Sequence, residues 1–309
     1  MSKERFIEAL ENNSISEIRS IPKSDLHNHA GRGGNLSYIE NMLNVKIDRL
    51  TKPLISLDEM QEWLNDNVKV HFPDKNGFIH RVAAAFVQAR ADNIAVLAMS
   101  YSIADITYFG SLDIFIVVMD GLHKVFAPET KFMPDLFLSC PSSLSQLDEI
   151  FNANWFKGID LVNYSNAMSM DDMKAICRKA RGHGLITKAH VGEFGSADDV
   201  MRYAEELELN QIQHGIAATS SPQIMNWLVK NKVQLNVCPT SNVLLGNTKS
   251  YETHQIRILF DYGVSVTINT DDLLIFDSTV SGEYLKLYNA GLMTAEELNI
   301  IREVGLSKG

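Results

Sequence analysis

The segment Asp25-Leu26-His27-Asn28-His29 places two histidines one residue apart in a stretch that is typical of a β-strand. Side chains alternate along a strand, so His27 and His29 are predicted to point to one face while Asn28 points to the other. Two imidazoles about 6–7 Å apart on one face can bind the same metal ion. Such pairs are also common in proteins that bind no metal, so the assignment depends on the rest of the chain.

Seven more strand-like segments follow this one, and helical segments separate them. The eight predicted strands occupy residues 25–29, 94–102, 132–140, 156–162, 185–191, 211–215, 233–238 and 264–269. Strands rich in Val, Ile and Leu that alternate with helices predict a parallel sheet covered by helices. Eight units close a (β/α)8 barrel, whereas the alternative, an open doubly wound sheet, lacks a Gly-x-Gly-x-x-Gly turn to support it. We therefore predict an α/β fold with a single TIM-type barrel domain over residues 1–309.

Residues 36–90 form the longest connection in this pattern. Their apolar side chains recur at helical spacing, with a break expected at residues 73–77. Long insertions of this kind often form lids over a binding site. We therefore predict a helical lid inserted after the first strand.

Composition and charge restrict the class of protein. The net charge is −10 and no long basic run occurs, so neither nucleic acid nor a membrane surface is expected as a partner. The apolar runs are too short to cross a bilayer, and the first 20 residues lack the apolar core of a signal sequence. The sequence has three cysteines, Cys140, Cys177 and Cys238, and their spacing forms no metal-binding pair. We expect all three to be buried in the protein, and free cysteines are typical of a reducing, cytoplasmic environment. No pattern predicts the oligomeric state.

The ends of the predicted strands carry an unusual set of polar residues. In a (β/α)8 barrel these C-terminal ends carry the chemistry, and here they hold His27, His29, His190, Glu193, His214, Asp271 and Asp272. Burying so many titratable groups is costly unless they pair with one another or with a metal. Three imidazoles and one carboxylate favour Zn²⁺ over Ca²⁺ or Mg²⁺. Such an ion lowers the pKa of bound water to about 7, which predicts metal-assisted hydrolysis at an electrophilic carbon.

Six segments of the chain resemble the adenosine deaminase family of the amidohydrolase superfamily. They run in the family's order between Pro22 and Tyr284 and comprise PKSDLHNHAG, GIDLV, AHVGEF, IQHGIAA, CPTSNVLLG and TINTDDLLIFDSTVSGEY. The AHVGE, QHG and NTDD sequences are specific as a set. The resemblance implies one zinc ion per chain, held by His27, His29, His190 and Asp271.

The same resemblance implies the roles of the remaining residues. Glu193 would protonate purine N1, next to the amino-bearing carbon C6. His214 would position the attacking hydroxide and, with Asp271, complete the catalytic set. Asp272 would hydrogen-bond the imidazole side of the purine. Neither Cys140-Pro141 nor Cys238-Pro239 continues into a second cysteine, which excludes the cytidine-deaminase type of zinc site.

Departures from the family pattern concern the substrate. Gly31 stands where the family has an acidic residue that meets the 5′-hydroxyl of the sugar, and Arg32 follows it. Asn163 replaces a glycine whose backbone N–H meets purine N3, and Ser102 keeps a family-like position near the pocket. The reversed local charge indicates a phosphate or another anionic group on the substrate. The alternative is that Arg32 faces solvent and Gly31 merely makes room.

We therefore predict a zinc-dependent hydrolytic deaminase that converts a 6-aminopurine nucleoside or derivative to a 6-oxopurine and ammonia. Adenosine, adenine, AMP and other phosphorylated or modified adenine compounds remain candidate substrates. One alternative is a different amidohydrolase with two metals and a bridging carboxylated lysine, for which Lys188 lies at the wrong end of its strand. Another is a catalytically inactive metal-binding homologue, although neither a ligand nor Glu193 is missing.

Overall fold

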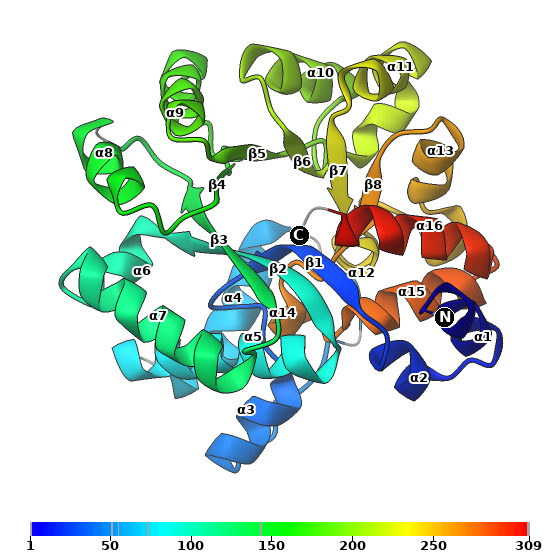
Figure 1. Cartoon of the computed structure of the whole chain (residues 1–309), viewed down its shortest axis with the longest axis horizontal. Coiled ribbons are helices and arrows are strands. Elements are labelled where there is room, and N and C mark those ends of the chain that lie inside the picture. Colours follow the sequence, from blue (N-terminus) through cyan, green and yellow to red (C-terminus); the bar gives the residue numbers. More distant parts are fainter. Residues whose placement is uncertain (1, 51, 55, 73, 143, 308–309) are drawn as a thin grey trace.

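Eight parallel strands, hydrogen-bonded in chain order, form the centre of the molecule (Figure 1). The computed structural model describes residues 2–50, 52–54, 56–72, 74–142 and 144–307. The strands are β1 (Lys23–His29), β2 (Ile94–Ser102), β3 (Lys131–Leu138), β4 (Gly158–Leu161), β5 (Ile186–Val191), β6 (Gln211–His214), β7 (Gln234–Val237) and β8 (Val266–Ile268). Each coincides with a predicted strand to within two or three residues at its ends. The predicted TIM barrel is confirmed, and the open doubly wound alternative is wrong.

Helices surround the strands and bury their apolar faces against the barrel (Figure 1). Those of the outer ring are α5 (Lys75–Ala91), α7 (Leu112–Phe126), α8 (Leu144–Asn152), α9 (Met170–Gly182), α10 (Ala197–Glu206), α11 (Pro222–Asn231), α13 (Ile256–Asp261), α15 (Val280–Asn289) and α16 (Ala295–Leu306). Ser169, Ser196 and Thr294 begin their helices with capping boxes, in which side chain and backbone satisfy each other's free groups. In the described part of the chain, no helix combines the length and apolarity that a membrane span requires.

Shorter helices complete the molecule. They are α1 (Ser2–Glu11), α2 (Ile15–Arg19), α6 (Ile103–Thr107), α12 (Pro239–Leu244), α14 (Leu273–Phe276) and the 3-10 turns η2 (Ile216–Ser220) and η3 (Tyr251–Thr253). Of these, α6, α12 and α14 directly follow strands β2, β7 and β8. They therefore lie at the end of the barrel where the predicted site residues are.

Side chains join the first strand to the last. The buried amide of Asn269 accepts a hydrogen bond from Leu26 N (2.8 Å) and donates one to Val237 O (3.2 Å). Asp25 accepts hydrogen bonds from Thr270 N (3.2 Å) and Thr270 Oγ1 (2.6 Å). One residue further along, Asp271 N donates to the carbonyl oxygen of His27 (2.9 Å). We call these residues of β1 and the β8 end the seam; they close the barrel where the two histidines of β1 face Asp271.

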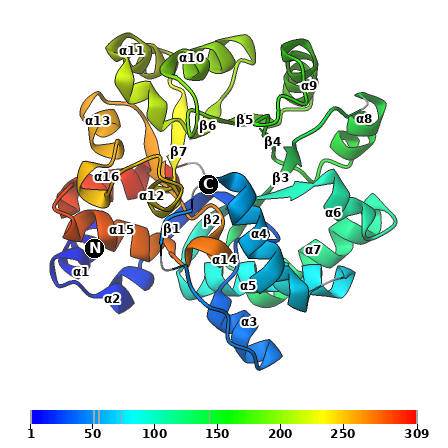
Figure 2. The same ribbon diagram turned by 180° about the vertical axis from the view of Figure 1, so that it is seen from behind.

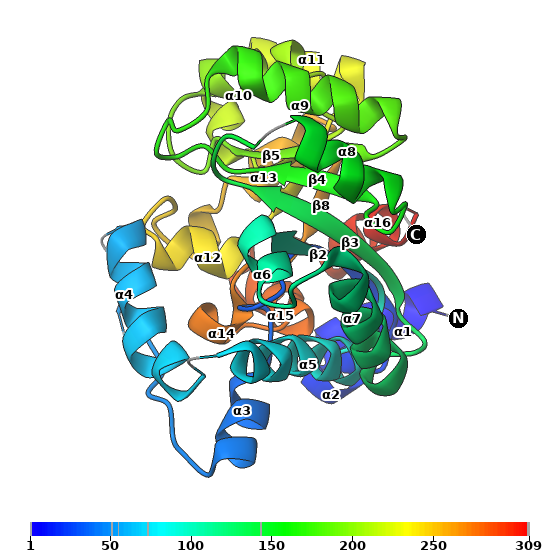
Figure 3. The same cartoon turned by 90° about the vertical axis from the view of Figure 1, so that its left-hand side faces the viewer.

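The insertion after β1 consists of α3 (Leu36–Leu43), α4 (Leu57–Asn67), η1 (Lys69–His71) and the start of α5. It has an apolar cluster of its own, in which Leu36, Ile39 and Leu64 pack with residues 274–276 of α14. Figures 2 and 3 show α4 beside α14. The expected break at 73–77 is shorter than predicted, because α5 begins at Lys75 with Asp74 as its N-cap; Pro73 lies outside the described residues.

One expectation about the cysteines is wrong. Cys177 and Cys238 are buried as predicted, but Cys140 is exposed. It lies two residues beyond the end of β3, where the chain has already left the sheet. Strand periodicity therefore no longer determines its burial.

The seam makes a testable contribution to stability. Replacing Asn269 by Ala leaves the buried N–H of Leu26 without its partner, which typically costs about 1–3 kcal/mol in the free energy of unfolding. Urea denaturation measures this loss. Asn12→Ala, at an exposed position after α1, is the control. A loss no larger than that of the control would contradict the structural role of the seam.

Candidate active site

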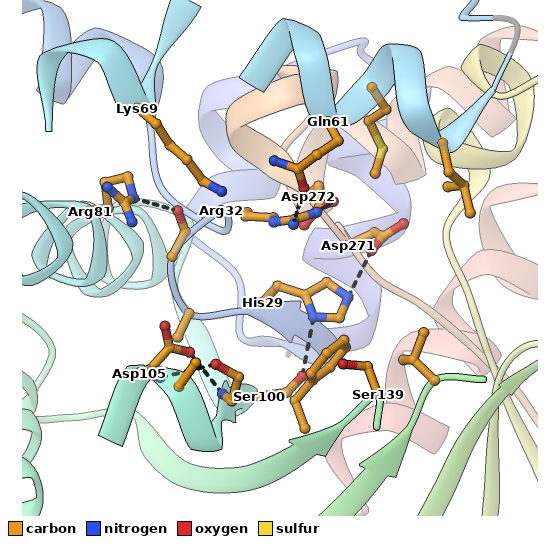
Figure 4. Close-up of a pocket in the computed structure, with 18 of the residues that line it drawn as sticks. His29, Arg32, Gln61, Lys69, Arg81, Ser100, Asp105, Ser139, Asp271 and Asp272 are labelled. Carbon is orange, nitrogen blue, oxygen red and sulfur yellow. Dashed lines mark hydrogen bonds and ion pairs between the residues drawn. The ribbon is translucent and has the colours of Figure 1, made fainter. Parts of the chain in front are cut away.

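A cavity of about 640 Å³ opens at the C-terminal ends of the strands. Figure 4 shows its lining around His29 and Asp271. Its barrel side is formed by residues predicted from the strand ends, namely His29, His190, Glu193, His214, Asp271 and Asp272. Its other side is formed by the insertion, with Met60, Gln61, Lys69, Phe72, Phe78 and Arg81. The fold thus brings together residues that are almost 250 positions apart in sequence.

Three histidines and one carboxylate converge below this cavity. His27 Nε2 lies 2.9 Å from His190 Nε2 and 3.4 Å from Asp271 Oδ1. His29 Nε2 lies 3.2 Å from the same carboxylate oxygen. Ring nitrogens this close, in side chains that are buried or nearly so, can share a single ion. The predicted ligand set therefore assembles in space.

Neighbouring side chains contact the atoms of His27, His29 and Asp271 that point away from the centre of the cluster. Cys238 Sγ lies 3.3 Å from His27 Nδ1, and Ser100 Oγ lies 3.4 Å from His29 Nδ1. Ser241 donates a hydrogen bond of 2.7 Å to Asp271 Oδ2. Outer partners of this kind fix the orientation of metal ligands. The sequence prediction missed them, although their positions at the ends of β2 and β7 could have indicated them.

Protonation differs among the members of the cluster. Burial lowers the pKa of His190 to about 3, so its imidazole is neutral, the form that binds metals. Burial opposes the charged form of His29, but its hydrogen bond to Asp271 and the charge of Asp272 raise its pKa to about 9, so a metal that binds here must displace a proton from His29. The charge of His27 helps to hold the pKa of Asp271 well below its usual range despite burial. Imidazoles with an ionised carboxylate are a donor set that fits a first-row divalent ion such as zinc.

Glu193 and His214 lie beside this cluster. His214 Nε2 is 3.5 Å from Glu193 Oε2 and 3.9 Å from Asp271 Oδ2. Burial, followed by the charge of Asp271, raises the pKa of Glu193 to about 8. The carboxyl group of Glu193 therefore holds a proton at neutral pH and can donate it to a ligand.

Tyr164 is a site residue that the sequence prediction missed. Its hydroxyl donates a hydrogen bond to Glu193 Oε2, and its ring stacks on His190 with 6.1 Å between centroids. The loop that carries it is held by Asn163, whose side chain bonds both N and O of Met168 (2.9 and 3.0 Å). No local sequence signal identifies Tyr164, because only the tertiary fold places it over Glu193.

The structure also locates the residues predicted to select the substrate. Arg32 lines the cavity, with Nη1 3.2 Å from Asp272 Oδ2 and Nη2 2.7 Å from Gln61 Oε1. Gly31 lines it too, and its carbonyl accepts a hydrogen bond from Arg81 Nε at 3.0 Å. Ser102 lines the cavity while capping α6. The side chain of Asn163, by contrast, serves its own loop.

Comparison with known proteins gives the wider context. The family model for adenosine deaminase matches residues 139–307. A putative adenosine/adenine deaminase from Treponema pallidum is 30% identical over 297 residues, which cover 94% of this chain and 99% of that protein. The chain belongs to the adenosine deaminase family. Membership makes it a hydrolytic deaminase that acts on C–N bonds.

Solved structures share the fold of this adenosine deaminase family member. An amidohydrolase from Burkholderia ambifaria with bound Zn has a TM-score of 0.74 at 17% identity, covering 94% of this chain and 86% of that one. An Arabidopsis protein named ADAL, in complex with GMP, has a TM-score of 0.74 at 15% identity, covering 94% of this chain and 93% of that one. In the described part of this chain, the groups of side chains that could hold a metal ion include His27 with His190 and His214, and His29 with Asp271 and Asp272.

The metal site makes a direct prediction. His190→Ala removes one imidazole from the cluster and is expected to lose most of the bound metal. Elemental analysis of the purified variant measures this loss. His183→Ala, at the C-terminal end of α9 and 3.8 Å from Asp148, is the matched control and is expected to retain the wild-type metal content. Equal metal in the two variants would contradict the assigned ligand set.

Proposed function

We propose that this family member is a zinc-dependent deaminase that converts a 6-aminopurine to a 6-oxopurine and ammonia, with one zinc ion per chain. The observation that carries the proposal is the position of Glu193, a buried acid next to the His/Asp cluster and on the wall of the cavity. The adenosine/adenine deaminase name of the Treponema relative supports a 6-aminopurine.

His27, His29, His190 and Asp271 would hold the zinc ion, which would supply a nucleophile by lowering the pKa of a water molecule that it binds. Glu193 would donate its proton to ring nitrogen N1, which makes C6 more electrophilic. Neutral His214, within reach of both Glu193 and Asp271, would position the attacking oxygen and stabilise the charge that develops on it. Asp272, which lines the cavity beside Asp271, would accept a hydrogen bond from the imidazole half of the purine.

The alternative with two metals and a bridging lysine receives no support from the geometry. Lys188 forms a buried ion pair with Asp135, with 2.5 Å between Nζ and Oδ2. This pair lies within the barrel, and its lysine nitrogen is already committed to the carboxylate. Asp160 is the next carboxylate toward the cluster. It lies 3.9 Å from His190 Nε2 and accepts a hydrogen bond from Ser100 Oγ at 3.2 Å. A carboxylate, and not Lys188, is therefore the side chain that lies next to His190 on this side.

Glu193→Gln tests the proposed acid. The amide keeps the shape of the side chain but cannot deliver a proton, so kcat for the deamination of a 6-aminopurine is expected to fall about 10²–10⁴-fold. Ammonia release from adenine, adenosine and AMP measures this effect. Zinc content should stay near one per chain, and Glu208→Gln at a surface position is the control. The proposed function fails if the zinc-loaded wild type releases ammonia from none of these compounds.

Tyr164→Phe tests the contact above Glu193. Removal of the hydroxyl deletes one hydrogen bond to the carboxyl group, and we expect kcat to fall about tenfold because the acid is held less precisely. Steady-state kinetics separates this loss in kcat from a change in KM. Tyr262→Phe, at an exposed position, is the control. A Tyr164→Phe enzyme with wild-type kcat would show that the hydrogen bond does not position the acid.

A further inference from the structure

Three cationic side chains line the cavity on the side formed by the insertion and the turn after β1. Arg32 comes from the turn after β1, Lys69 from η1 and Arg81 from α5. Figure 4 shows Lys69 directed between the two arginines, across the cavity from His29. Three separate segments of chain, two of them in the insertion, thus place positive charge at one end of the cavity.

Arg81 is fixed in place by neutral groups. Its Nε donates to Gly31 O (3.0 Å) and its Nη1 donates to Phe72 O (3.3 Å). The guanidinium also lies over the rings of Phe72 and Phe78, 5.9 and 5.7 Å from their centroids. The residue is only 8% exposed. Its position is therefore rigid, while its charge remains unneutralised by these contacts.

Lys69 is half-buried beside the two arginines. Burial, and then the charges of Arg32 and Arg81, lower its pKa. Within the described residues, neither Lys69 nor Arg81 forms an ion pair with a carboxylate, whereas Arg32 is paired with Asp272. Asp105, whose negative charge acts on both Lys69 and Arg81, accepts the backbone N–H of Ser102 at 2.8 Å and caps α6. Lys69 and Arg81 thus lie near the charge of Asp105, but neither of them forms an ion pair with it.

Such an arrangement is unfavourable in the empty protein. Partly buried like charges repel one another, and each loses hydration that no carboxylate replaces. A bound anion reverses both effects. Its oxygens replace the lost hydration, and its negative charge attracts both cations and so offsets their repulsion. Arginine and lysine together suit an oxygen-rich, doubly charged group. A phosphate monoester carries about −1.5 to −2 charge at pH 7 and three acceptor oxygens.

We propose that Lys69 and Arg81, together with Arg32, form a subsite for a phosphate-type dianion on the substrate of this enzyme. The inference rests on the proposed function and names its substrate class: a 6-aminopurine whose sugar carries a phosphate monoester. With C6 placed at the His/Asp cluster, N9 lies at the far end of the purine, so a group attached at N9 extends across the cavity toward Lys69 and Arg81. The cavity of about 640 Å³ lies within the range of pockets that bind drug-sized ligands.

Substrate preference tests the subsite. We expect kcat/KM for AMP to exceed that for adenosine in the wild type. Lys69→Met keeps most of the side-chain volume and removes the charge, and it should reduce the ratio of the two kcat/KM values roughly 10–100-fold. Lys46→Met, at an exposed lysine of the same insertion, should leave the ratio unchanged. A third reaction, adenosine with added inorganic phosphate, shows whether the subsite takes a free anion rather than one attached to the substrate.

Binding measurements test the subsite without relying on turnover. Calorimetry with the zinc-loaded wild type should show tighter binding of IMP than of inosine, with an advantage that decreases as salt increases. Lys69→Met should reduce the affinity for IMP roughly 10–100-fold.

The outcomes separate the two proposals. Suppose that adenosine or adenine is deaminated as efficiently as AMP, and that IMP binds no more tightly than inosine. The subsite is then overturned, while the proposed function stands. Activation of adenosine turnover by free phosphate, without a preference for AMP, would also overturn the subsite as a substrate site. If no 6-aminopurine is deaminated but IMP binds more tightly than inosine and Lys69→Met abolishes the difference, the function fails and the anion subsite survives.

Discussion

The closure of the barrel between β1 and β8 is the constraint on which the site depends. At this seam the amide of Asn269 and the carboxylate of Asp25 form hydrogen bonds that backbone groups form elsewhere in the sheet. Only after this closure does His27 meet Asp271, whose backbone N–H bonds the His27 carbonyl. The His/Asp cluster is therefore not an addition to a finished barrel. Its side chains belong to the same few residues that complete the fold.

The polar groups of the site are linked to one another because burial leaves them few alternatives. A buried carboxyl group such as Glu193 is costly when ionised, and its raised pKa reflects this cost. The same burial lowers the pKa of His190, so its imidazole stays neutral. One physical condition, exclusion of water from the end of the barrel, thus keeps Glu193 protonated and His190 uncharged.

The sequence predicted the barrel and its floor well because both follow repeating rules. Apolar strands alternate with helices, and in a parallel barrel the residues at strand ends must meet, so His190, His214 and Asp271 could be placed together without coordinates. The cavity wall formed by the insertion and by the loop after β4 follows no such repeating pattern. Lys69, Arg81 and Tyr164 lie in the insertion or in a loop, and their directions are set by tertiary contacts. The same limitation explains why Cys140, just beyond β3, was wrongly expected to be buried.

The bridge from Gln61 through Arg32 to Asp272 has a consequence for any change to the insertion. Gln61 lies on α4 of the insertion, while Asp272 lies on the barrel floor, and the guanidinium of Arg32 bonds both. The insertion is thus connected through one side chain to a carboxylate on the cavity wall. The position of Arg32 in the cavity therefore depends on the insertion and the barrel together, and a change at Gln61 would alter the surroundings of Asp272.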